Sequence, residues 1–183
     1  MTFKNQGCCG HIFPALDGLL AIQAQHPFQP EELARIHVAG YRATAEMCDR
    51  PSVQTEQEAR FSLQYCVAAL LHHHGAVRLD AFTPERLRDP VLQAFMPKVS
   101  VSRAPDLVDA FPRRRAARLR LELRDGRMLE HEQPTRKGDP EDPLTNAELD
   151  AKFRELAGPV LGEQGAELPG PVAPLAMPKA ETL

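Results

Sequence analysis

One segment limits the fold more than any other, because it is predicted to be a helix with apolar side chains on most of its circumference. Thr55, followed three residues later by Glu58, is the pattern of a capping box, which satisfies free amides at a helix start. A long helix from about Glu56 to His73 follows, and its large apolar members are Phe61, Leu63, Tyr65, Cys66, Val67, Leu70 and Leu71. A helix without a polar face must be buried at the centre of the fold.

The segments around this helix predict a small sheet and several further helices. Leucines alternate with polar residues from Ala117 to Arg124, and Asp125-Gly126 is a hairpin turn signal before a returning segment at 127–133. Further strands are expected at 35–41 and 99–102, and helices at 14–26 and after Thr83, Asp89 and Thr145. The prediction is therefore an α+β fold, a small antiparallel sheet packed with helices.

The domain organisation follows from where this patterning starts and stops. The chain has 183 residues, which suits one domain plus a loose tail. Residues 1–13 read as a loop, residues 14–157 as the α+β domain, and residues 158–183 as a tail rich in Pro and Gly. Such a tail favours neither helix nor strand and is predicted to be disordered.

Composition excludes several classes of function. A net charge of −3 gives no electrostatic reason to bind nucleic acid, and no apolar run reaches the ~20 residues that span a bilayer. With no leader sequence expected, we predict a soluble cytoplasmic protein without membrane contact. The cysteines at 8, 9, 48 and 66 form no CxxC pair, so we expect reduced thiols and no zinc site, with Cys48 and Cys66 as small buried residues.

Two clusters of basic residues have an ordinary interpretation and a functional one. Three consecutive histidines at 72–74 resemble a metal tract, but neighbouring helical residues face different directions, which favours histidines that compensate the helix dipole. Arginines are dense from Arg113 to Arg127 and could bind phosphate. Their alternation along a strand, without interleaved aromatic residues, instead favours a solvated face or a subunit contact.

Three stretches resemble one known family in the order in which that family has them. They are Phe3-Lys-Asn-Gln-Gly-Cys-Cys-Gly-His-Ile-Phe-Pro-Ala-Leu-Asp17, Glu58-Ala-Arg-Phe-Ser-Leu-Gln-Tyr65 and the Pro-containing loop and capped helix at 137–153. From Phe3 to about Ala157 the chain resembles the C-terminal domain of the MmgE/PrpD family, which includes 2-methylcitrate dehydratases and cis-aconitate decarboxylases. The resemblance implies a lyase of propionate metabolism that acts on small di- and tricarboxylic acids, without metal or organic cofactor, by removing a proton or a carboxyl group.

The resemblance also implies site residues. Lys4 matches the family's active-site lysine, although Asn5-Gln6-Gly7 replace a stiff Pro-Tyr-Pro; without the resemblance, Lys4 would be a solvated side chain near a frayed end. We expect a catalytic role for Lys4, and substrate contacts from Lys4, Cys8, Cys9, His11, Asp49, Arg50, Gln64 and Tyr65. For Gln64 and Tyr65 packing in the core is the alternative. Met47 stands where the decarboxylase branch has a tyrosine, and a thioether cannot donate a proton.

The remaining catalytic groups are expected to come from elsewhere. In the family, the base, the acid and further histidines belong to a helical domain that precedes the lysine segment. Because Met1 stands three residues before Lys4, we expect that domain to be a separately encoded partner, the isolated chain to be inactive, and the assembled enzyme to be a homodimer. The alternatives are a non-catalytic truncated member that binds a partner or regulates, and a protein that binds an acid without turnover.

Overall fold

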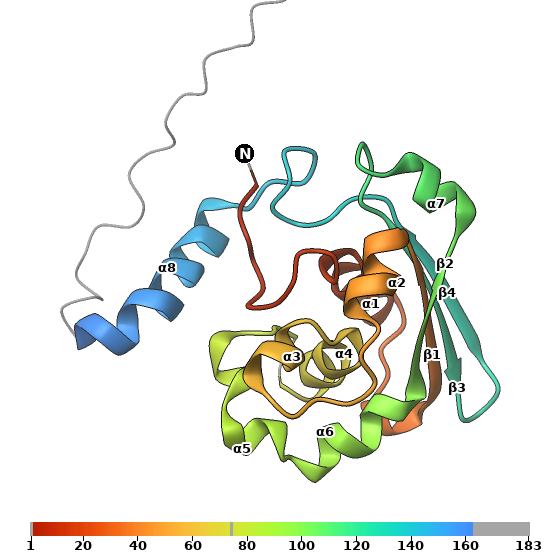
Figure 1. Ribbon diagram of the computed structural model, residues 1–183, viewed down its shortest axis with the longest axis horizontal. Coiled ribbons are helices and arrows are strands. Elements are labelled where there is room, and N and C mark those ends of the chain that lie inside the picture. Colours follow the sequence, from red (N-terminus) through yellow and green to blue (C-terminus); the bar gives the residue numbers. More distant parts are fainter. Residues whose placement is uncertain (1, 74, 163–183) are drawn as a thin grey trace, which may run out of the picture. The chain divides into compact units, whose positions relative to one another are not determined.

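The computed structural model describes residues 2–73 and 75–162, and the chain divides into two compact units, Met1–Asp142 and Pro143–Leu183 (Figure 1). The first unit is α+β, as predicted. Its helices are α1 (Phe13–Gln25), α2 (Arg42–Cys48), α3 (Glu56–Arg60), α4 (Leu63–His72), α5 (Pro84–Leu87), α6 (Pro90–Phe95) and α7 (Pro105–Ala110). Its strands are β1 (Leu33–Gly40), β2 (Val99–Arg103), β3 (Ala117–Leu123) and β4 (Met128–Gln133). The second unit contributes α8 (Asn146–Leu161).

The sheet is mixed rather than purely antiparallel. Its strand order is β2-β1-β3-β4, and the pairs β1–β3 and β3–β4 are antiparallel. β2 runs parallel to β1, with Val99 opposite Ile36. The segment between these two strands carries α2 to α6, and a crossover of this kind returns the chain to start a parallel strand.

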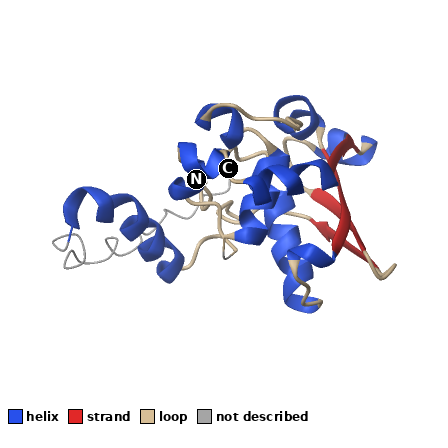
Figure 2. Ribbon diagram, turned by 90° about the horizontal axis from the view of Figure 1, so that it is seen from below, coloured by secondary structure: helices blue, strands red, loops and turns tan. Residues whose placement is uncertain are grey.

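One face of the sheet forms the main core. The predicted inward positions Leu119, Leu121 and Leu123 of β3 are buried, together with Ile36 and Val38 of β1. Helix α1 lies against β3 and β4, α4 contacts β2, and α3 lies next to α4 (Figure 1). Most of the helices lie to one side of the strands (Figure 2). All residues of α4 from 63 to 70 are buried, which confirms the central position predicted for this segment.

The long helix predicted from Glu56 to His73 is wrong in one respect, because it is two helices. The capping box of Thr55 and Glu58 is present and starts α3, but α3 ends at Arg60. The hydroxyl of Ser62 accepts a bond from the Tyr65 amide (3.0 Å) and donates one to the Arg50 carbonyl (2.6 Å). Ser62 therefore caps a new helix and competes with the helical bonds of the old one.

At the other end, the capping box of Thr145 and Glu148 starts α8 as predicted. The helix continues through Pro159 to Leu161, four residues beyond Ala157, where the sequence predicted its end. Most of the predicted tail, residues 163–183, lies outside the described residues. Within the part that the structure describes, no helix is both long and apolar enough to cross a membrane.

Candidate functional site

The amino-terminal segment is attached to the loop that follows β4. The Phe3 amide donates to the Gly138 carbonyl (2.9 Å), and the Thr2 hydroxyl donates to Asp139 Oδ1 (2.6 Å). Gly138 has φ +96°, and a Cβ at this position would lie 2.0 Å from the Phe3 oxygen, so only glycine fits. Lys4 is exposed, but it extends from a backbone that these two bonds hold in place.

Three further hydrogen bonds fix the next residues, although the prolines of the family pattern are missing here. The Gly7 amide donates to the Val77 carbonyl (2.7 Å), and the Val77 amide donates to Gln6 Oε1 (2.7 Å). The Cys9 amide donates to the Arg60 carbonyl (2.8 Å). The segment from Lys4 to His11 is thus held at both ends and in the middle.

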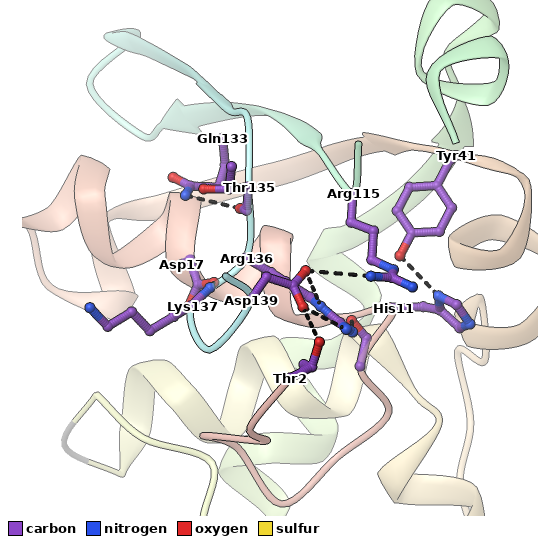
Figure 3. A network of polar contacts seen from close by, with 11 residues as sticks. Thr2, His11, Asp17, Tyr41, Arg115, Gln133, Thr135, Arg136, Lys137 and Asp139 are labelled. Carbon is purple, nitrogen blue, oxygen red and sulfur yellow. Dashed lines mark hydrogen bonds and ion pairs between the residues drawn. The ribbon is translucent and has the colours of Figure 1, made fainter. Parts of the chain in front are cut away.

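A buried ion pair lies beside this segment (Figure 3). Arg136 Nε and Nη2 donate to the two carboxylate oxygens of Asp139 at 2.7 and 3.0 Å, and Nη1 donates to the Gly10 carbonyl at 3.1 Å. Both residues are less than a tenth exposed. Burial alone would raise the pKa of Asp139, but the hydrogen bonds from Arg136 and Thr2 outweigh it and lower that pKa. The pair is therefore charged at neutral pH.

Arg115 adds a second guanidinium to the same carboxylate. Its Nη1 lies 3.5 Å from Asp139 Oδ2, whereas its Nε is buried and has no hydrogen-bond partner among the described residues. Arg115 also lines a hollow of about 350 Å³, together with Thr2, Thr135 and Asp139. A cationic side chain that lines a hollow is a place where an anionic ligand can bind.

On the other side of Arg115, His11 pairs with Tyr41 (Figure 3). His11 Nδ1 lies 2.9 Å from the Tyr41 hydroxyl, and the Tyr41 ring stacks on Phe111 with centroids 4.6 Å apart. Burial lowers the pKa of His11, and the charges of Arg136, Arg115 and Lys4 lower it further, so the ring is neutral at pH 7. Burial raises the pKa of Tyr41 to about 12, so this phenol stays protonated and orients the imidazole.

A second acid approaches the loop from α1. Asp17 Oδ2 accepts a bond from the Lys137 amide at 2.7 Å. Burial raises the pKa of Asp17 to about 6, more than the amide and the nearby cations lower it. The carboxyl group of Asp17 therefore binds the loop at Lys137 and is partly protonated near neutral pH.

The arrangement combines excess positive charge with a neutral imidazole. The cations Lys4, Arg115 and Arg136 all act on His11, and Asp139 is the carboxylate that pairs with the two arginines. Such a group of charges attracts an anion, and guanidinium groups favour carboxylates because of their paired donors. Neutral His11 can exchange a proton with a ligand held there.

The structure brings together only some of the predicted site residues. Lys4, Cys9 and His11 are close enough for the lysine charge to act on the other two, and the Cys8 thiol is buried next to Cys66. The assignments of these residues to substrate remain predictions.

The other predicted residues form a separate hydrogen-bonded group. Gln64 donates to Asp49 Oδ1 (2.6 Å) and accepts from the Arg50 amide (3.1 Å). The Tyr65 hydroxyl donates to the Ala81 carbonyl, and burial raises the pKa of Tyr65. These contacts agree with the packing interpretation of Gln64 and Tyr65.

Sequence reasoning missed Tyr41, Arg115, Arg136 and Asp139. Arg115 belongs to the arginine-rich stretch, whose strand members behave as predicted: Arg118 pairs with Glu132 (2.8 Å) and Arg120 with Glu130 (3.4 Å) on an exposed face. Arg115 differs from them because it contacts the buried Asp139, twenty-four residues later, and the local pattern does not encode that contact.

Of the histidine tract, His72 is the last residue of α4 and His73 is its C-cap, whereas His74 lies outside the described residues. The His72 ring contacts Phe95 edge-on with centroids 5.2 Å apart. Burial lowers the pKa of His73, so the predicted compensation of the helix dipole by cationic histidines stays a prediction. In residues 2–73 and 75–162, no three His, Cys, Asp or Glu side chains are grouped to hold a metal ion.

Comparison with known families supports the resemblance seen in the sequence. The MmgE/PrpD C-terminal domain matches residues 7–168, which is most of the chain. No individual curated protein gives a match. The matched range contains α1, the whole sheet, α4 and the loop with Arg136 and Asp139. The chain therefore belongs to the MmgE/PrpD family, and residues 7–168 form its C-terminal domain.

Proposed function

We propose that the site binds a small di- or tricarboxylic acid and serves a lyase of the 2-methylcitrate dehydratase type. The observation that carries the proposal is the position of Arg115, which lines a hollow and acts together with Lys4 and Arg136 on a neutral His11. A ligand carboxylate in this hollow would pair with the Arg115 guanidinium. Asp139, which contacts both arginines, would keep Arg115 in place, and Arg136 would hold Asp139 rather than bind the acid directly.

The proposed reaction needs no metal or organic cofactor. A base removes the proton next to a carboxylate, and the electron pair moves into that carboxylate to give an enolate-like dianion. Lys4 and Arg115 offset this growing negative charge, and fixed cations in a partly dry site do so at low reorganisation cost. A β-hydroxyl group then leaves as water after it receives a proton from an acid.

His11 is the candidate for one of these proton transfers, and Tyr41 is its positioning residue. The Tyr41 hydroxyl at 2.9 Å fixes one ring nitrogen and leaves the other for a ligand. The second acid–base group would come from a separately encoded helical domain of the family. The assembled enzyme would be a homodimer.

The test is an assay of methylcitrate dehydration and cis-aconitate decarboxylation with and without a co-expressed helical half. Turnover is expected only with both parts, and it should fall about 10- to 150-fold in Lys4→Ala and Arg115→Met, since a charged hydrogen bond contributes about 1.5–3 kcal/mol. The control is Arg120→Met, which removes an arginine from the exposed sheet face. Equal losses in all three variants, or turnover by the chain alone, would contradict the proposal.

One feature favours the alternative of a non-catalytic fragment that binds an acid or a partner. The direct partner of His11 is Tyr41, and a phenol whose pKa is raised to about 12 is a poor proton-transfer group at neutral pH. This alternative predicts stabilisation of the chain by carboxylic acids without product, even when the helical half is present.

A further inference from the structure

The four cysteines form two thiol pairs at the base of the amino-terminal segment. The Cys8 thiol lies next to that of Cys66 in α4, and the Cys9 thiol lies next to that of Cys48 at the end of α2. All four are buried and none is in a disulfide. Consecutive residues of one loop thus contact thiols on two different helices.

The two pairs have different surroundings. Cys66 is fully buried; burial and the contact with Cys8 raise its pKa, and its thiol donates to the Ala59 carbonyl at 3.5 Å. The surroundings of Cys9 have the opposite effect and lower its pKa. The hydrogen bond from Cys48 lowers the pKa of Cys9 most, burial opposes it, and the His11 amide, Lys4 and Arg136 lower it further. Donors and cations of this kind favour a thiolate.

The loop holds Cys9 in place, and Cys9 is slightly more exposed than Cys48. The Cys9 amide is bonded to the Arg60 carbonyl at 2.8 Å, so the loop holds the sulfur next to Cys48. Cys9 is 9% exposed, whereas Cys48 and Cys66 are 0% exposed. A peroxide can therefore approach Cys9 more easily than either helix thiol.

We propose that Cys9 is an oxidation site for peroxides and that Cys48 converts the product into a Cys9–Cys48 disulfide. The Cys9 thiolate attacks one peroxide oxygen, the O–O bond breaks, and a sulfenic acid and hydroxide form. The Cys48 sulfur then attacks the Cys9 sulfur, the S–O bond breaks, and the oxygen leaves as water with the Cys48 proton. The two thiols are oxidised by two electrons and the peroxide is reduced to two molecules of water.

The bond would connect the end of α2 to the loop that carries Lys4 and His11. Because Cys9 precedes His11 by two residues, the disulfide would restrict the motion of the backbone that carries His11. This inference does not depend on what the site binds.

The first measurement needs no variant: the full chain is treated with hydrogen peroxide at pH 7, and its peptides are mapped under non-reducing conditions. We expect a Cys9–Cys48 linkage before any other. In Cys48→Ala, Cys9 should stop at the sulfenic acid and be trapped by dimedone, while the matched variant Cys66→Ala should still form the linkage.

The second measurement is the pH dependence of iodoacetamide labelling, read at each cysteine by mass spectrometry. Cys9 should label with a midpoint below the value of about 8.5 for a free thiol, and Cys48→Ala should raise that midpoint. A first linkage between Cys8 and Cys66, or labelling of Cys9 with an ordinary thiol midpoint, would overturn the proposal.

Discussion

Removal of the Asp139 carboxylate tests the part of the structure that holds the candidate site together. In Asp139→Ala, the guanidinium of Arg136 loses two hydrogen bonds of 2.7 and 3.0 Å and remains buried. Thr2 and Arg115 lose their contacts with the same carboxylate. A buried charge left without its partner costs about 3–5 kcal/mol, so we expect a loss of that size in the free energy of unfolding.

The assay is urea denaturation followed by circular dichroism, with thermal unfolding as a second readout. For a unit of this size the expected fall in Tm is on the order of 10 °C. The matched control is Asp106→Ala, which removes a carboxylate from the exposed Arg118, where solvent screens the pair and little stability should be lost. The double variant Asp139→Ala with Arg136→Met should be more stable than Asp139→Ala alone, because no buried charge remains.

The sign of the pH dependence follows from the lowered pKa of Asp139. This group stabilises the fold above its unfolded pKa of about 3.9, and the contribution is lost as the pH falls through the lower folded value. The difference between wild type and Asp139→Ala should thus be full at pH 7 and shrink below about pH 4. If Asp139→Ala costs no more than Asp106→Ala at pH 7, the buried pair does not have the role described.

Three further results are expected. Burial raises the pKa of Asp17 from 3.8 to about 6, so its carboxylate lowers the stability of the fold as the pH rises through this window. In urea titrations, this loss should be about 2 kcal/mol between pH 4.5 and 7.5, and Asp17→Asn should remove it. Gly138→Ala should release the amino-terminal segment and speed hydrogen exchange at the Phe3 amide, whereas Gly126→Ala, with φ +88° but no atom within 4 Å, should not. Ser62→Ala should cost about 1–2 kcal/mol in urea unfolding, because a helix cap and a bond to the Arg50 carbonyl are lost together.

Local patterns predicted those elements whose ends are encoded by neighbouring residues. The capping boxes at Thr55 and Thr145 and the turn at Asp125-Gly126 were right because their partners are three residues away or fewer. The break at Ser62 was missed because one of its two bonds goes to Arg50, twelve residues earlier. The parallel pairing of β2 was missed for the same kind of reason, since it joins residues more than sixty positions apart.

The candidate site was predicted less completely than the fold. Family resemblance pointed to Lys4, Cys9 and His11, which do share one electrostatic environment. Asp139 lies within the stretch 137–153 that the sequence had singled out, and Arg136 directly precedes it, but their partners Thr2 and Gly10 are at the other end of the chain. From sequence alone, a charged pair in a Pro-rich loop is expected to be solvated, and only the fold shows that this pair is buried.

The most direct test of the acid-binding site is an NMR titration of the His11 imidazole in the full chain, with and without saturating cis-aconitate. The free chain should show a His11 pKa below 6.5, because of burial and the three nearby cations. Bound acid should raise that pKa, since its negative charge offsets Lys4 and Arg115, and the rise should be lost in Arg115→Met but kept in Arg120→Met. A His11 titration that is the same with and without the acid would contradict the account.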